Sequence, residues 1–590
     1  MSRPIEDYAM LGDGHTAALV SRDGSIDWLC WPRFDSDACF AALLGTEEHG
    51  RWRIGAAEPG AEISRRYRDD TLILETRIST ASGEAMVTDY MPIAEDGVSS
   101  VVREIRGLRG EVALESRLRL RFDYGSVKPW VRSWGGEVVG VVGPDLVVLR
   151  GDREHRASQE EARCDFTLAE GDTVRFTLQH GPSHRDVPAP LDLQRSERDA
   201  EAFWRNWAAQ FDRPTEWPVQ VKRSLLTLKA LIHRPTGGMV AAPTLGLPEE
   251  PGGGMNWDYR FCWLRDATFT LIALLNAGYR DDAHAWLQWL LRAVAGVPEQ
   301  MRVMYRVDGA RHLEEWEVPW LPGYDGAKPV RVGNAAVEQH QLDIFGEVLD
   351  CTFLAESTGI ERTPWDVEVE GRLVAHLERT WREPDRGMWE SRDPPRHYVH
   401  SKVMAWVAVD RFIRSSRGRS DCDAERLQRL ETLQAEMHAE ICREGFNPSR
   451  NSFVQSYGAE ELDASLLLLP LVQFLPVEDP RMAGTIAGIE RHMMEGGLVR
   501  RYEPPFMAGE GTFLACSFWL ADCMLLQGRR DEARALFERV LGLCNDVGLL
   551  AEGYHVGNGR MTGNFPQALS HLALVNTALA LCGPVVQRGG

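Results

Sequence analysis

The chain has 590 residues and a formal net charge of −21, from 66 basic and 87 acidic side chains. This length is enough for two or more domains. The acidic balance argues against nucleic acid and anionic membranes as main partners, because phosphate binding needs clustered Lys and Arg. A neutral small molecule fits better as the partner. The 19 tryptophans are compatible either with large cores or with flat surfaces for sugar stacking.

Cysteine usage and the N-terminal sequence indicate a cytoplasmic protein. The 11 cysteines are scattered and include no CxxC pair, which is typical of reduced thiols. The opening stretch MSRPIEDYAM is polar and lacks the apolar core of a signal peptide. The most apolar run, Leu466 to Pro476, is too short to span a bilayer and contains prolines.

Residues 1–190 have the pattern of short strands. Two apolar runs flank Asp23-Gly24 in HTAALVSRDGSIDWLCW, which predicts a hairpin. Apolar alternation recurs at 71–80, 111–125, 137–150 and 172–181. Short strands at regular spacing, separated by turn residues, predict an antiparallel β-sandwich. The following segment, 191–214, has a helical period and is predicted to link two domains.

Residues 215–590 contain twelve helical patterns whose connections alternate between short and long. Antiparallel helices turn at opposite ends of a bundle, so the six long loops are expected to share one face. Six such pairs that close on themselves form an (α/α)6 barrel. An open helical solenoid is the alternative, but no fixed-length repeat supports it. Long loops on a rigid scaffold usually carry function.

Two glutamates on these loops are candidates for catalysis. Glu390 lies in the third long loop and Glu552 in the sixth, and these positions are opposite one another in a ring of six. Two carboxyl groups across a pocket suit glycoside hydrolysis, where one protonates the leaving oxygen and the other activates water or attacks. Trp389 beside Glu390 is expected to desolvate the carboxyl group, which would raise its pKa and keep it protonated.

Other polar residues on the loops offer alternatives. Six further carboxylates are expected to be mostly structural: Asp258, Asp308, Asp325, Asp393, Glu503 and Glu510. His397 and His400 lie three residues apart without an evident third ligand, so no metal site is predicted. The sequence contains no P-loop, no dinucleotide glycine motif and no G-x-S-x-G elbow, and no cofactor is predicted.

Several segments resemble glycoside hydrolase family 15, the group of glucoamylases, glucodextranases and bacterial trehalases. The segment IEDYAMLGDGHTAALVSRDGSIDWLCWPRFDSDACFAALLG is similar to the start of the trehalase-like N-terminal domain found in one branch. The stretches GGGMNWDYRFCWLRDATFTL, PVRVGNAAVEQHQLDIFGEVLD, PPRHYVHSKVMAWVAVDR, EGTFLACSFWLADCML and GNFPQALSHLALVNTAL resemble the barrel signatures. The resemblance implies a β-sandwich followed by an (α/α)6 barrel, as the periodicity also predicts.

The resemblance also implies site residues and an inverting mechanism. It makes Glu390, which follows Trp389, the general acid, and it makes Glu552 the general base. The pair Arg265-Asp266 would bind the non-reducing glucose in the deepest subsite. Trp263 would help to line that subsite, and Trp389 is also expected to bind substrate.

The sequence departs from the family pattern at two places. Gly553 follows the predicted base, where many relatives carry a second acidic residue. The second long loop has the sequence EEWEVPWLPGY at 314–324, where relatives often have a sequence similar to ELPHLEGY. That loop is expected to touch the leaving group and so to affect the choice of substrate.

The sequence thus predicts three parts: a trehalase-like β-sandwich (1–190), a linker helix (191–214) and a catalytic barrel (215–590). The predicted function is an exo-acting, inverting α-glucoside hydrolase, with α,α-trehalose as the first substrate. Hydrolysis of maltose, isomaltose or dextrins in the manner of a glucoamylase or glucodextranase is the nearest alternative. A non-catalytic sugar-binding protein is another, disfavoured because both glutamates and Arg265-Asp266 are present. A phosphorolytic enzyme would not need the base that Glu552 supplies.

Overall fold

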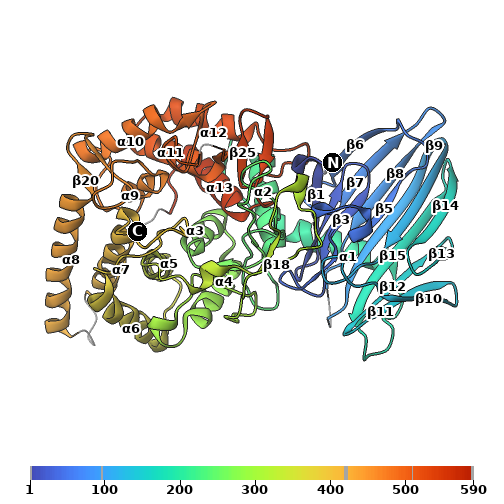
Figure 1. Ribbon diagram of the computed structural model, residues 1–590, viewed down its shortest axis with the longest axis horizontal. Helices are drawn as coiled ribbons and strands as arrows, with labels where there is room; N and C mark the ends of the chain where they lie inside the picture. The colour runs from blue at the N-terminus through green and yellow to red at the C-terminus, as the bar shows by residue number, and fades with distance from the viewer. Residues whose placement is uncertain (1–2, 95–96, 418–422, 508, 587–590) are drawn as a thin grey trace.

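The computed structural model describes residues 3–94, 97–417, 423–507 and 509–586. A β domain formed by the N-terminal part of the chain lies beside a larger helical domain (Figure 1). No helix in these four ranges is long and apolar enough to cross a membrane.

The β domain is built from antiparallel strands. The first eight are β1 (Tyr8–Gly12), β2 (Ala17–Ser21), β3 (Ser25–Cys30), β4 (Ala38–Phe40), β5 (Arg51–Ala56), β6 (Glu62–Tyr67), β7 (Leu74–Ser79) and β8 (Gly83–Tyr90). The others are β9 (Ser99–Arg119), β10 (Trp130–Trp134), β11 (Glu137–Val142), β12 (Asp145–Gly151), β13 (Arg156–Ala157), β14 (Ala162–Ala169) and β15 (Thr173–Pro182). The predicted hairpin around Asp23-Gly24 joins β2 to β3.

The long strand β9 connects the two halves of this domain. Its first part pairs with β8 and β15, and its second part pairs with β5 and β14. One strand therefore belongs to both layers of strands. Alternate residues of β14 are buried and exposed, as expected for a sheet with one face on the core. The predicted antiparallel sandwich fold is confirmed.

A helix, α1 (Leu193–Ala208), follows the β domain and is capped by the side chain of Asp192. Twelve α-helices then follow in the described part of the chain. They are α2 (Pro218–Leu231), α3 (Ala267–Ala277), α4 (Arg280–Val294), α5 (Asp343–Ser357), α6 (Pro364–Thr380), α7 (Val399–Ser416), α8 (Ala424–Glu444), α9 (Leu468–Leu471), α10 (Pro480–His492), α11 (Leu514–Leu526), α12 (Arg530–Leu541) and α13 (Ala568–Cys582).

These helices form two concentric rings. The inner helices α3, α5, α7, α9, α11 and α13 contact one another in that order, and α13 returns to α3. Inner helices such as α3 are buried on all sides, whereas an outer helix such as α4 buries only one apolar stripe. The predicted (α/α)6 barrel is confirmed.

One inner helix is much shorter than the sequence suggests. The run DASLLLLPLVQFL was expected to form a full helix, but α9 spans only Leu468–Leu471 after a 3₁₀ turn at Ala464–Leu467. Pro470 lacks an N–H group and restricts the residue before it. Gln473 then has a positive φ of 62°, so the chain leaves the helical conformation.

The long loops carry short strand pairs of their own. These are β16 (Cys262–Trp263) with β17 (Met304–Tyr305), β18 (Trp316–Glu317) with β19 (Arg331–Val332), β20 (Phe446–Asn447) with β21 (Ser452–Phe453), β22 (Met494–Glu495) with β23 (Leu498–Val499), and β24 (Thr512–Phe513), β25 (Gly553–His555) and β26 (Arg560–Thr562). They give the loops regular backbone hydrogen bonds, which hold side chains in fixed positions.

The β domain packs against the loop end of the barrel. Trp28 of β3 donates its indole N–H to the carbonyl of Pro243 at 2.7 Å. Arg65 of β6 pairs with Asp546 of the sixth long loop at 2.8 Å. The β domain therefore supports the loops that carry the candidate site.

Candidate active site

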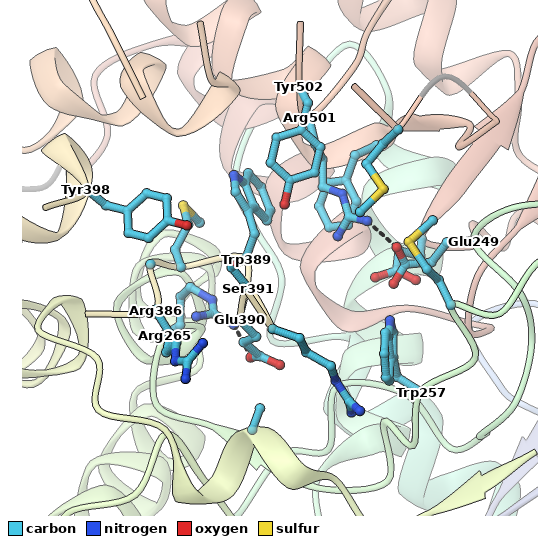
Figure 2. A pocket seen from close by; sticks show the side chains of 18 of the residues that line it. Glu249, Trp257, Arg265, Arg386, Trp389, Glu390, Ser391, Tyr398, Arg501 and Tyr502 are labelled. Atoms are coloured by element: carbon cyan, nitrogen blue, oxygen red, sulfur yellow. Dashed lines mark hydrogen bonds and ion pairs between the residues drawn. The ribbon is translucent and has the colours of Figure 1, made fainter. Parts of the chain in front are cut away.

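All six long loops of the barrel contribute to one pocket of about 460 Å³ (Figure 2). Every site residue predicted from the sequence lines it: Trp263, Arg265, Asp266, Trp389, Glu390 and Glu552. The third and sixth loops, which the ring order places opposite one another, thus bring Glu390 and Glu552 to the same cavity.

Two donors from the first long loop hold the carboxyl group of Glu390. The indole N–H of Trp263 and the guanidinium of Arg265 each donate to Glu390 Oε1 at 2.5 Å. Glu390 has a φ of 57°, and its N–H donates to the carbonyl of Gly387 at 3.1 Å. This tight turn directs the carboxyl group toward Arg265 (Figure 2).

Glu552 lies buried at the start of β25, with only 2% of its surface exposed. Its Oε1 accepts the hydroxyl hydrogen of Tyr259 at 2.6 Å, and Oε2 has no hydrogen-bond partner among the described residues. Burial raises the pKa of this carboxyl group well above its usual value, and the negative charge of Glu249 adds to the shift. Arg501 and the hydrogen bond from Tyr259 act in the opposite direction.

Arg265 and Asp266 are adjacent at the start of α3. Arg265 also donates to Gln341 at 3.2 Å and lies 3.5 Å from a carboxylate oxygen of Asp343. Asp266 occupies the N-cap position, but its side chain makes no capping hydrogen bond. Burial raises the pKa of Asp266 to about 6, against the lowering effect of Arg265. Its carboxyl group is therefore not used to cap α3 and can bind a ligand in the pocket.

Trp389 lines the pocket and makes contacts of its own. The indole N–H of Trp389 donates to Asp463 at 2.9 Å, and its ring stacks on Trp519 with centroids 6.1 Å apart. Figure 2 shows this ring directed toward Tyr502. The indole that donates a hydrogen bond to the carboxyl group of Glu390 belongs to Trp263, and the expected desolvation of that group by Trp389 stays a prediction.

Three residues of the pocket were not predicted as site residues: Glu249, Tyr259 and Arg501. Arg501 pairs with both Glu249 and Glu510, and the ion pair with Glu249 is drawn in Figure 2. Burial raises the pKa of Glu249 to about 7, with Arg501 lowering it. Tyr259 stands in the quoted segment NWDYRFCWLRD, but nothing in the sequence indicated its partner.

Most of the alternative carboxylates are engaged in ion pairs. Asp258 pairs with Arg260, Asp308 with Arg33, Glu503 with Arg450 and Glu510 with Arg501. Asp258, Asp308, Asp325 and Glu510 do not line the pocket, whereas Asp393 and Glu503 do. The pocket thus distinguishes Glu390 and Glu552 from four of the six alternative carboxylates.

The helical barrel and the pocket suit a glycoside hydrolase, and the comparisons with known proteins show that class. The chain belongs to glycosyl hydrolases family 15, whose family model matches residues 219–579. A second model, described as "Trehalase-like, N-terminal", matches residues 1–204.

Curated relatives and solved structures agree with this assignment. The chain is 37% identical to a trehalase of Mycobacterium tuberculosis, over 98% of this chain and 89% of that protein. It is 33% identical to a trehalase of Thermoplasma volcanium, over 99% of this chain and 94% of that protein. The structure of a bacterial glucoamylase complexed with acarbose matches with a TM-score of 0.72 and 11% identity, over 99% of this chain and 95% of that one. At that identity, the structural match shows a common fold.

Proposed function

We propose that this protein hydrolyses α,α-trehalose to two glucose molecules with inversion at the attacked carbon. The observation that carries the proposal is the meeting of Glu390 and Glu552 in one pocket beside Arg265 and Asp266. The trehalases that are 37% and 33% identical over nearly the full chain support the choice of substrate.

In the proposed reaction, Glu390 is the acid and Glu552 the base. Protonated Glu390 gives its proton to the glycosidic oxygen as the bond from that oxygen to C1 breaks. Glu552 takes a proton from a water molecule, whose oxygen bonds to C1 from the opposite face. Glu390 ends as a carboxylate, which Arg265 stabilises by a charge-assisted hydrogen bond. Proton exchange with solvent restores both groups.

Tyr259 orients the base. Burial, together with the nearby charge of Glu552, raises the pKa of Tyr259 well above its usual value. The phenol therefore stays protonated and donates a hydrogen bond to Glu552 Oε1. This bond fixes the carboxylate, while Oε2 makes no hydrogen bond to the part of the chain that the structure describes. Oε2 is the oxygen that would accept the proton of water.

Inversion requires space for that water between the base and the sugar. The carboxyl groups of Glu390 and Glu552 are therefore expected to lie about 6.5–9.5 Å apart in a substrate complex, and about 5 Å would favour a retaining mechanism. Proton NMR of the first glucose released would give the stereochemistry directly. Equal amounts of α- and β-glucose at the earliest time are expected from trehalose, since only the attacked ring inverts.

Substrate choice is tested by glucose release from trehalose, maltose, isomaltose and dextran. We expect trehalose to have the highest kcat/KM. A preference for maltose, isomaltose or dextran would favour a glucoamylase-like or glucodextranase-like hydrolase. Glucose release from none of them would contradict the proposal and favour a sugar-binding protein. Phosphorolysis would instead produce glucose phosphate in phosphate buffer.

Two variants distinguish the role of the acid from that of the base. Glu390→Gln should slow trehalose far more than α-glucosyl fluoride, because fluoride departs without protonation. Glu552→Gln should slow both substrates, since both need an activated water. If Glu390→Gln slows the fluoride as much as trehalose, Glu390 is not the acid.

We also propose the domain limits 1–190, 191–214 and 215–590, supported by the end of β15 at Pro182 and by α1 at Leu193–Ala208. A cytoplasmic location is proposed on the pattern of cysteines. Ten of them, in the described ranges, are free thiols.

A further inference from the structure

Arg392 is fixed at the edge of the pocket by two neighbours. Its guanidinium lies 4.4 Å from the centre of the Trp257 ring. It also pairs with both carboxylate oxygens of Glu315, at 3.1 and 2.6 Å. Glu315 is itself held, because its Oε2 accepts the N–H of Ala335 at 3.1 Å. A stacked and doubly bonded guanidinium has little freedom to move aside.

The two contacts join three of the long loops. Trp257 belongs to the first loop, Glu315 to the second, and Arg392 to the third, two residues after Glu390. Trp257 and Arg392 line the pocket, whereas Glu315 does not. This part of the second loop is the segment that departs from the family pattern.

Exposure places Arg392 at the mouth of the pocket. Its side chain is 46% exposed, whereas Trp263 and Glu552 are 5% and 2% exposed. Phe506 of the fifth loop also lines the pocket and is 47% exposed. The deep groups form the subsite for the attacked glucose, so the leaving sugar lies toward Arg392 and Phe506.

We propose that Arg392, held between Trp257 and Glu315, closes the pocket mouth around the leaving glucose and restricts the enzyme to disaccharides. This inference rests on the proposed function. A third sugar on the leaving glucose would have to pass through the space that Arg392 occupies. A mobile arginine side chain would move aside for the third sugar, whereas the side chain of Arg392 is held in place by Trp257 and Glu315.

The chain offers a matched control in Arg331. Its guanidinium also lies near the Trp257 ring, at 4.8 Å, and it pairs with Glu315 at 3.6 Å. Arg331 does not line the pocket. Removing Arg331 thus disturbs the same cluster and changes the net charge by the same amount, without opening the mouth of the pocket.

The test compares trehalose with a trisaccharide in which one glucose of trehalose carries a further α-linked glucose. The measured quantity is the ratio of kcat/KM for the trisaccharide to that for trehalose, with attack at the terminal trehalose ring identified from the products. Arg392→Ala should raise this ratio about tenfold or more, and Arg331→Ala should leave it unchanged within about twofold. Thermal unfolding should show both variants folded.

Two results would overturn the inference: an unchanged ratio in Arg392→Ala, or an equal rise in Arg331→Ala. Failure of the proposed function is recognised separately, because the wild-type protein would then release no glucose from trehalose. In that case, calorimetric binding of the two sugars to the wild-type protein and both variants still decides the inference. Arg392→Ala alone should then gain affinity for the trisaccharide relative to trehalose.

Discussion

Asp266 illustrates how the structure separates a binding role from a helix-capping role. Aspartate before a helix usually caps it and favours its dipole, but the side chain of Asp266 makes no capping bond to α3. A half-buried carboxylate that lines the pocket can accept hydrogen bonds from sugar hydroxyl groups. Each charge-assisted bond is worth about 1.5–3 kcal/mol.

Asp266→Asn should therefore lower kcat/KM for trehalose about 10- to 100-fold. Thermal stability should change little, because no capping bond is lost. Initial rates and thermal unfolding of the same preparation would test this. Loss of stability with retained activity of the folded fraction would assign Asp266 to a structural role.

The charge of Glu249 should set the acid side of the pH profile. Since the pKa of Glu249 is about 7, its carboxyl group is ionised mainly above that pH. There, replacing Glu249 by Gln removes a negative charge near Glu552 and releases Arg501, and both changes favour ionised Glu552. The pKa of the base should then fall, so activity should persist to lower pH than in the wild-type protein. Profiles of kcat/KM from about pH 4 to pH 8 measure this shift.

Glu510→Gln is the matched control, since Glu510 also pairs with Arg501 but does not line the pocket. A smaller shift in the same direction is expected from it. If the acid side of the kcat/KM profile stays in place in Glu249→Gln, or moves to higher pH, the electrostatic coupling of Glu249 to Glu552 is contradicted.

The turn that presents the acid depends on a glycine. Gly387 has a φ of 68°, and a Cβ added there would lie 2.9 Å from the ring of Tyr398. Because its carbonyl accepts the N–H of Glu390, Gly387→Ala should displace the acid and lower kcat by about 100-fold. Gly458→Ala is the control: its φ is 75°, but nothing lies within 4 Å of an added Cβ. Similar kcat values for the two variants would contradict a positioning role for this turn.

The helices and the loop that carries each glutamate could be predicted from the sequence, because periodicity and loop order are local signals. The contacts within the site could not. Tyr259 lies 293 residues from Glu552 and Trp263 lies 127 residues from Glu390, and such pairs depend on how loops pack. The hydrogen bond from Trp389 to Asp463, 74 residues further along the chain, was equally beyond sequence reasoning.

The two domains share a buried cluster next to the site. Arg260 of the first long loop is 1% exposed and pairs with Asp258 at 2.7 Å. It also donates to the carbonyl of Ser36 at 2.6 Å and to the hydroxyl of Tyr124 at 2.9 Å, both in the β domain. Since Tyr259 lies between Asp258 and Arg260 in the chain, this cluster connects the β domain to the orientation of the base.

Arg260→Ala should therefore reduce both stability and activity. It leaves Asp258 buried without its cation, which costs about 3–5 kcal/mol, and it loosens the segment that carries Tyr259. Asp308→Ala removes another ion pair between the domains, with Arg33 at 2.6 Å, but these side chains are 40% and 28% exposed. That pair should contribute no more than about 1 kcal/mol. Chemical denaturation and kcat of both variants would test the difference, and equal losses would show that the buried cluster does not support the site.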